Sequence, residues 1–244
     1  MTSATPPAER SDLGPFEALS RIFRAFFTPR ALAEAIRARP NWVFPLLFSI
    51  LLSFFIAAEV IGRPEWQETL RKALEQSGQK LGELEKVQLL SAMRAVSWVG
   101  FLAAPVLGNL FLGLLLWRIS VMLEGKSGFL PVFSFQLHAQ MVKTIPETAV
   151  LGWLLARAGP GTVDDQTPLP LNLAYFLPTG SMAPLAKAIL ESVEILGIWY
   201  WVLVIVGLSI VAGIPWRRLL GPAFFLWAIG VLIKTSFRVF SAAS

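Results

Sequence analysis

The chain has 244 residues and a net charge of +5; 55% of its residues are hydrophobic, only 15% are charged, and its mean hydropathy is +0.62. A soluble domain has about 25% charged residues to cover its surface, so this composition excludes an ordinary soluble protein and indicates one whose outer face meets lipid. Because the chain has no cysteine and a single histidine, it excludes disulfides, thiolate metal sites and multi-histidine metal centres.

The first 40 residues precede the first apolar run of membrane length. Residues 1–14 are polar and are expected to be disordered. Residues 15–40 form an amphipathic segment, for which we predict two short helices in the plane of the membrane interface. Thr28 should cap the second helix with Pro29 at its first position, and Pro40 should close it. The apolar face predicted for the first helix consists of Phe16, Leu19, Ile22, Phe23 and Phe26.

Five segments are predicted to cross the membrane as helices, since a bilayer core about 30 Å thick needs roughly 20 helical residues and open sheets are excluded there. They cover residues 42–62, 97–122, 131–157, 192–213 and 219–237. The predicted fold class is therefore all-α: an integral membrane bundle of five transmembrane helices, residues 41–238, with N-terminal interfacial helices.

The third predicted span, residues 131–157, is less apolar than the others and carries a polar stripe. Its members recur at helical spacing and therefore share one face: Gln136, Gln140, Lys143 and Glu147. An isolated charge at mid-membrane costs about 2.5–3.5 kcal/mol, so the stripe should face the bundle interior, with Lys143 and Glu147 paired. It can hold helices together, which we favour, or line a functional path.

Two loops outside the spans are long. Residues 63–94 mix leucines with charged residues and predict an amphipathic helix or hairpin, interrupted at Gly78 and Gly82. Residues 159–186 are rich in proline and glycine, and no regular structure is predicted for them.

Small residues recur at four-residue spacing in the second span. Gly100, Ala104 and Gly108 would let another helix approach closely. We expect that helix to belong to the same chain, in preference to a second copy.

No catalytic motif is present. His138 has no second histidine or adjacent glutamate, and neither a GxSxG sequence nor a phosphate-binding glycine loop occurs. We therefore expect no enzymatic activity and no catalytic, cofactor-binding or metal-binding residues. The basic residues flank apolar segments, which favours lipid headgroups over nucleic acid as their partner.

Five crossings would place the two termini on opposite sides of the membrane. The segment before the first span has six arginines, the two short loops carry further basic residues, and residues 159–184 have none. By the positive-inside rule the N-terminus is cytoplasmic and the C-terminus extracytoplasmic. Residues 63–94 oppose this assignment with six basic residues, which five glutamates accompany.

Three sequence blocks occur in a recognisable order between Phe16 and Ile233. They are FFTPRALAEAIRARPNWVFPLL, the loop EGKSGFLPVFSF before a span that ends in KTIP, and ESVEILGIWYWVLVIVGL. This order resembles bacterial Yip-domain proteins. The positions that carry the resemblance are Pro29, Pro40, Trp42, Pro146, Glu194, Trp199 and Gly207. The resemblance implies a five-span, non-enzymatic membrane protein with a cytoplasmic N-terminus.

We therefore expect a scaffold or interaction protein of the bacterial inner membrane, with the bilayer as its first partner. The arginine-rich segment from Arg21 to Arg39 would meet anionic lipid, protein partners or a second copy. The alternative is a small transporter or lipid-handling protein that uses the polar face of the third span.

Overall fold

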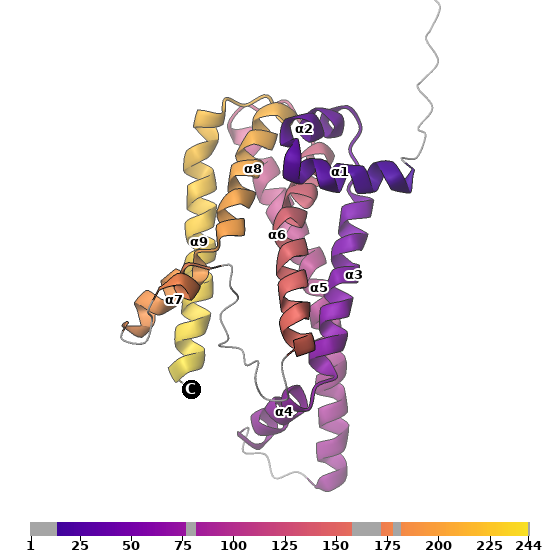
Figure 1. Cartoon of the computed structure of the whole chain (residues 1–244), viewed down its shortest axis with the longest axis vertical. Coiled ribbons are helices and arrows are strands. Elements are labelled where there is room, and N and C mark those ends of the chain that lie inside the picture. The colour runs from indigo at the N-terminus through magenta and orange to yellow at the C-terminus, as the bar shows by residue number, and fades with distance from the viewer. Residues whose placement is uncertain (1–13, 77–81, 158–171, 178–181, 244) are drawn as a thin grey trace, which may run out of the picture.

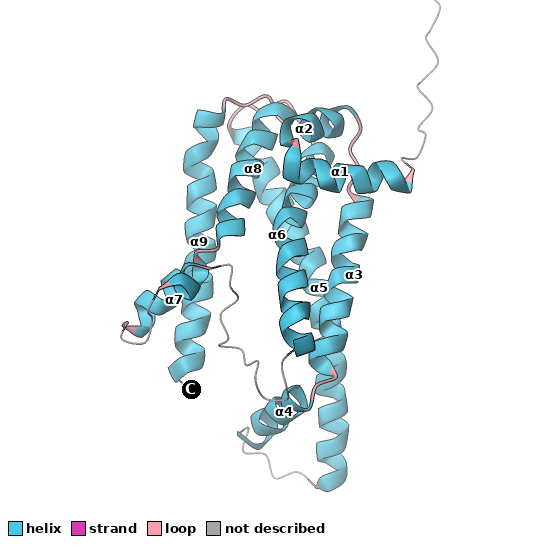
Figure 2. Cartoon of the chain, viewed as in Figure 1, coloured by secondary structure: helices cyan, strands magenta, loops and turns pink. Residues whose placement is uncertain are grey.

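The computed structural model describes residues 14–76, 82–157, 172–177 and 182–243. Within these ranges every regular element is a helix (Figure 2), so the fold is all-α. In chain order the elements are α1 (Pro15–Phe27), α2 (Pro29–Ala38), α3 (Val43–Ile61), α4 (Pro64–Gln76), α5 (Glu83–Met122), α6 (Phe129–Arg157), the 3-10 helix η1 (Leu173–Phe176), α7 (Pro184–Ser192), α8 (Ile195–Val211) and α9 (Trp216–Ala243).

Five long helices run alongside one another, and two short ones lie across one end of them (Figure 1). The long helices are α3, α5, α6, α8 and α9, and the short ones are α1 and α2, which together form the cap. The two short loops after α5 and α8 lie at the cap end and are joined by a hydrogen bond from the Lys126 amide to the Ala212 carbonyl, 3.0 Å. The C-terminus lies at the opposite end, as do α4 and α7 (Figure 1).

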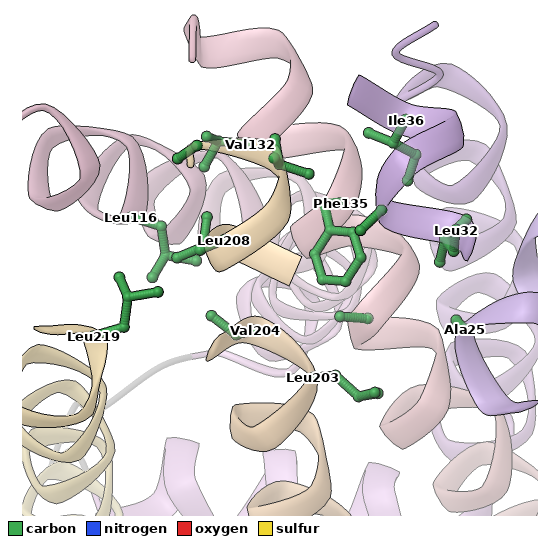
Figure 3. Close-up of a cluster of buried hydrophobic side chains, with 14 of the residues drawn as sticks. Ala25, Leu32, Ile36, Leu116, Val132, Phe135, Leu203, Val204, Leu208 and Leu219 are labelled. Carbon is green, nitrogen blue, oxygen red and sulfur yellow. The ribbon is translucent and has the colours of Figure 1, made fainter. Parts of the chain in front are cut away.

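Helix α2 is packed into the core and does not merely rest on the surface. Its inner residues Leu32, Ala33 and Ile36 are fully buried against α6 and α8. Figure 3 shows the Phe135 ring of α6 between these α2 side chains and those of α8. Thr28 and Pro29 begin α2 as predicted, although the Thr28 side chain makes no capping hydrogen bond.

Helix α1 does not present the single apolar face that its sequence suggested. Ile22 is 2% exposed and lies on the side of α1 that packs against α6. Phe16, Leu19 and Phe23 are exposed, where they are suited to the membrane interface. Small residues supply most of the rest of the buried face, which brings the α1 backbone close to the bundle.

Three helices are long and apolar enough to cross a membrane by length and composition: Val43–Ile61, Leu84–Met122 and Trp216–Ser236. Helix α8 is apolar but shorter, with 17 residues. Helix α6 has the length, 29 residues, but its polar stripe lowers its hydropathy. All five predicted spans are mainly helical in the structure. Three of them combine the length needed to cross a membrane with high hydropathy.

Helix α5 begins earlier than predicted, inside the expected loop 63–94. It has 40 residues, which makes it about 60 Å long, twice the bilayer core. Its first turns extend beyond the other long helices (Figure 1). A Gly82 amide bonded to the Glu85 carboxylate at 2.9 Å starts the helix there, at one of the two glycines where an interruption was predicted.

The fourth predicted span, residues 192–213, is interrupted near its beginning. Helix α7 ends at Ser192 and α8 begins at Ile195, with extended backbone at Val193 and Glu194. Helix α7 itself begins at Pro184, inside the loop that was expected to be irregular. The tail 1–13, Gly78 and residues 158–171 and 178–181 lie outside the described residues.

Candidate functional site

The polar stripe of α6 lies inside the bundle, and its cap-side member joins two helices. Gln136 is 1% exposed, and its Nε2 donates a hydrogen bond to Asn109 Oδ1 of α5 at 2.8 Å. Asn109 Nδ2 in turn donates to the Pro105 carbonyl, 2.6 Å away. Tyr200 of α8, 4% exposed, brings its hydroxyl beside Gln136. This part of the stripe is a polar contact between packed helices.

The other end of the stripe belongs to a charged cluster, made of Lys143, Glu147, Glu194 and Lys234. Lys143 Nζ lies 3.6 Å from Glu147 Oε1 and also pairs with Glu194 Oε2. Lys234 Nζ lies 2.5 Å from Glu194 Oε1. Two lysines and two glutamates make the cluster formally neutral, and it connects α6, α8 and α9.

The break between α7 and α8 positions Glu194. Its backbone forms an antiparallel bridge with Asn172, and the Leu173 amide donates to the Val193 carbonyl at 3.1 Å. Glu194 is the N-cap residue of α8, yet its side chain makes no capping hydrogen bond. Because the carboxylate does not bond its own helix, both of its oxygens reach lysines on other helices.

A cavity of about 200 Å³ adjoins the charged cluster. Gln140 lies on its wall, together with Lys143, Glu194 and Lys234. The rest of the wall consists of Leu112 of α5, Ser192 of α7 and mainly aromatic and aliphatic side chains of α8 and α9. At roughly 30 Å³ per water, the volume suits a few waters or one small polar ligand. The groups available are two ammoniums, a carboxylate and an amide, which can bind ions or hydrogen-bond a polar ligand.

His138 is fully buried on α6 and does not belong to this cluster. Its Nδ1 lies 2.8 Å from the Ser134 carbonyl, and because a carbonyl can only accept, Nδ1 carries the proton. Its Nε2 has no hydrogen-bond partner in the part of the chain that the structure describes. The histidine is therefore a packed core residue bonded to its own helix.

Four of the family-motif positions lie in or beside α2, α3 and α6. Pro29 begins α2 and Pro40 follows its end. Trp42 precedes α3, and its ring lies 6.1 Å from that of Phe133, centroid to centroid. Pro146 lies inside α6 beside the charged cluster.

The remaining motif positions lie on α8. Gly207 faces the Phe135 ring so closely that a Cβ atom there would stand 1.9 Å from a ring carbon, so only glycine permits this approach. Trp199 is 42% exposed on the outer side of α8. Glu194, the third of these positions, is the central acid of the charged cluster.

The small-residue stripe predicted to pack within the chain points outward instead. Gly100, Ala104 and Gly108 are exposed, and among the described residues, the adjoining turns of α5 aside, no atom would lie within 4 Å of a Cβ at either glycine. Close packing occurs at Gly113, where a Cβ would stand 2.5 Å from Phe133. The four-residue spacing correctly indicated that the three residues share one face. The prediction that this face packs against another helix of the chain was wrong.

Lys234 is the cluster member that sequence reasoning missed. It stands near the end of the fifth predicted span, where a lysine ordinarily extends to the interface. A usable signal was nevertheless present, since Lys234 is the single charged residue between positions 219 and 237. Intramembrane charges usually pair with one another, and Glu194 near the start of the fourth span offered the complementary charge.

The Yip1 domain matches residues 23–236 of the chain. The match runs from α1 to α9 and includes the whole charged cluster and every motif position. No curated protein and no solved structure matches the chain. On the strength of the domain match, which covers most of its length, the chain belongs to the Yip1 domain family.

Proposed function

We propose that the protein is a non-catalytic, five-span protein of a bacterial inner membrane, and that its cap binds protein partners on the cytoplasmic side. Membership of the Yip1 domain family and the three long apolar helices support a multi-pass membrane protein. The burial of α6 supports the number of crossings, the distribution of basic residues supports the orientation, and the outer surface of the cap supports the scaffold role.

The central position of α6 supports its crossing despite its lower hydropathy. Residues Val132–Ala139 are buried without exception, as are Met141 and Val142. The helix contacts α1, α2, α3, α5 and α8. A helix surrounded by other helices can carry polar side chains that a lipid-facing helix cannot. Helix α8 is about 26 Å long, a shortfall that a slightly thinner bilayer can accommodate.

The distribution of basic residues supports a cytoplasmic cap. Exposed basic side chains at this end come from the cap and from residues in and around the two short loops: Arg24, Arg30, Arg37, Arg39, Arg118, Lys126, Arg217 and Arg218. The Arg118 and Arg217 guanidiniums lie over the Trp117 and Trp216 rings, at 5.8 and 5.5 Å. Arginine and tryptophan are residues of the membrane interface, and an excess of arginine and lysine marks the cytoplasmic side.

The observation that carries the scaffold proposal is a cap whose inner face is buried and whose outer surface carries arginines without an ion pair among the described residues. Arg24, Arg37 and Arg39 are exposed and form no ion pair with any residue that the structure describes. The inner face of the cap is fixed by buried packing. Preorganised charges of this kind give an interface specificity and fast association with an acidic partner.

Arg21 does not belong to this surface, although it lies in the arginine-rich segment. It is 2% exposed, and its Nη1 donates to the Arg39 carbonyl at 2.8 Å. Its Nη2 lies 3.1 Å from a Glu17 carboxylate oxygen. Arg21 therefore holds α1 against the end of α2, and its role is structural.

The test is quantitative co-purification from native membranes with three side chains changed together, Arg24→Gln, Arg37→Gln and Arg39→Gln. The matched control is Arg71→Gln with Lys72→Gln on α4, at the opposite end of the bundle. We expect the triple variant to insert normally and lose the partners that the wild type and the control retain. Equal recovery of the same partners by the triple variant would refute the proposal.

A second candidate, a transporter or lipid-handling protein, is favoured by the charged cavity between α6, α8 and α9. For this candidate, proteoliposomes should show proton or sodium flux that Glu194→Gln abolishes while the protein still inserts. The scaffold proposal predicts flux no greater than that of protein-free vesicles.

A further inference from the structure

A second hollow lies beside the cap, on the outer side of the bundle. Helices α2, α8 and α9 enclose a groove of about 550 Å³, within the range of about 300–1,000 Å³ that ligand sites occupy. Helix α2 contributes Arg30 and Glu34, and α9 contributes Trp216 and Leu220. The wall on α8 consists of Val202, Ile205, Val206, Ser209 and Ile210.

The apolar wall of this groove is a continuous helical stripe. Its α8 residues recur at i, i+3, i+4, i+7 and i+8, so they form one face. From Val202 to Ile210 the stripe is about 12 Å long, close to the depth of one lipid leaflet, which is about 15 Å. The C-terminal end of α8 lies at the cap (Figure 1), so the stripe runs from the charged residues of α2 toward the bilayer interior.

The two charged residues of the groove face it without neutralising each other. Arg30 and Glu34 stand at i, i+4 on α2, a spacing at which ion pairs commonly form. Both are exposed, and within the described residues neither forms an ion pair with the other or with a third group. A guanidinium and a carboxylate are therefore both available to a ligand, one helical turn apart.

We propose that the groove binds one zwitterionic phospholipid with a primary ammonium in its headgroup, of the phosphatidylethanolamine type. The Arg30 guanidinium binds the lipid phosphate, because its planar fork matches two phosphate oxygens. The Glu34 carboxylate accepts hydrogen bonds from the lipid ammonium, and one acyl chain lies along the α8 stripe.

This arrangement explains a preference among headgroups. Phosphatidylglycerol has a net negative charge, and its headgroup has no ammonium that the Glu34 carboxylate could bind. A phosphatidylcholine headgroup carries a positive charge but no N–H to donate, so the carboxylate loses its hydrogen bonds. The ammonium of phosphatidylethanolamine satisfies both the charge and the hydrogen-bonding capacity of Glu34.

The test is native mass spectrometry of the delipidated full-length protein, titrated with the three phospholipids carrying identical acyl chains. We expect the wild type to prefer phosphatidylethanolamine. Arg30→Gln should weaken binding of all three lipids about tenfold, the effect of one charge-assisted hydrogen-bonded contact. Glu34→Gln should lower phosphatidylethanolamine binding most, because it loses both the charge and the hydrogen bonds of the ammonium, so that the preference over phosphatidylcholine disappears. Arg71→Gln and Glu75→Gln, at the same spacing on α4, are the matched controls and should change nothing.

Equal binding of the three lipids by the wild type would overturn the proposal, and so would unchanged binding by Arg30→Gln. Val206→Phe narrows the groove and should reduce lipid binding while leaving the oligomeric state unchanged. Unchanged lipid binding by this variant would likewise overturn the proposal. A lipid-free dimer that Val206→Phe dissociates would identify the groove as a contact between copies. Equally tight binding of glycerophosphoethanolamine, which has no acyl chains, would show that the α8 stripe plays no part.

Discussion

The Glu194 carboxylate, at the break between α7 and α8, is ion-paired with the Lys143 ammonium on α6. Its other oxygen pairs with Lys234 of α9 at 2.5 Å, so a single acid connects three helices. The side chains of Glu194 and Lys143 are each 19% exposed, which limits their access to solvent. Lys143 has a second acid in Glu147, whereas the described residues give Lys234 no other partner.

Glu194→Gln should therefore be the most damaging single change in the charged cluster. It removes the acid that is ion-paired with Lys234 and leaves the cluster with a net positive charge. Removing one member of a partly buried ion pair should cost about 2 kcal/mol, below the 3–5 kcal/mol of a fully buried pair because the cluster is partly exposed. Thermal unfolding in detergent, followed by helical circular dichroism, measures the loss.

Glu147→Gln is the matched comparison, since Lys143 keeps Glu194 after this change. Its expected cost is about 1 kcal/mol or less. If both variants unfold at the same temperature as the wild type, the cluster does not hold the helices together.

Gly207→Ala should destabilise the bundle through overpacking. The added Cβ would stand 1.9 Å from the Phe135 ring, so α8 or the ring must move, at a cost of about 1–3 kcal/mol. Phe135→Leu combined with Gly207→Ala should recover part of the loss. The same unfolding assay reports both effects.

Gly108→Ala provides the control for Gly207→Ala, because open space lies beside Gly108. Alanine favours a helix over glycine by about 1 kcal/mol, so this variant should be as stable as the wild type or more so. A destabilised Gly108→Ala would show that the outward-facing stripe packs against another helix, such as that of a second copy.

Asn109→Ala tests the polar contact between α5 and α6. The substitution removes the acceptor of the 2.8 Å hydrogen bond from Gln136 and leaves a buried amide unsatisfied. Interhelical hydrogen bonds in membranes contribute about 0.6–2 kcal/mol. In a double-mutant cycle with Gln136→Leu, we expect a coupling of about 1 kcal/mol. A coupling near zero would mean that the two side chains do not interact.

Glu124→Gly should stabilise the end of α5. Glu124 has a φ of 65°, in the left-handed region, and the Gly125 amide closes the helix by donating to the Ser120 carbonyl at 2.8 Å. The substitution relieves the strain of the left-handed conformation, but glycine also has greater freedom in the unfolded chain. The net effect should raise the free energy of unfolding by about 0.5–1 kcal/mol. The variant also loses an exposed ion pair with Arg218 at 3.7 Å.

Glu124→Gln separates these two effects, because it keeps the backbone strain and removes only the ion pair. An exposed pair contributes about 0–1 kcal/mol, so this variant should unfold near the wild-type temperature. A Glu124→Gly protein less stable than Glu124→Gln would contradict the strain argument.

The helices of the membrane domain could be predicted because their signal is local. Apolar runs gave the approximate limits of α3 and α9, and the helical spacing of its polar residues supported the prediction of α6. The period of 3.6 residues likewise indicated that Gln136, Gln140, Lys143 and Glu147 share one face. Both inferences use only residues within a few turns of one another.

Contacts between distant segments could not be derived in this way. The pairing of Lys143 with Glu194 depends on a helix break at Val193, which an unbroken apolar run concealed. The burial of Leu32 and Ile36 depends on where α2 meets α6 and α8, since an amphipathic helix can lie equally well on lipid or on protein. The outward position of Gly100 has the same origin: spacing identifies a face, and only the tertiary structure determines what it meets.

The number of membrane crossings is the central claim, and labelling of single cysteines tests it most directly. The chain has no native cysteine, so Ser127→Cys, Arg217→Cys, Gln67→Cys and Ser244→Cys can each be probed in intact cells with an impermeant thiol reagent. We predict labelling from outside at positions 67 and 244 only, and labelling at 127 and 217 only after the membrane is opened. Labelling of 127 and 67 from the same side would contradict the five-span account.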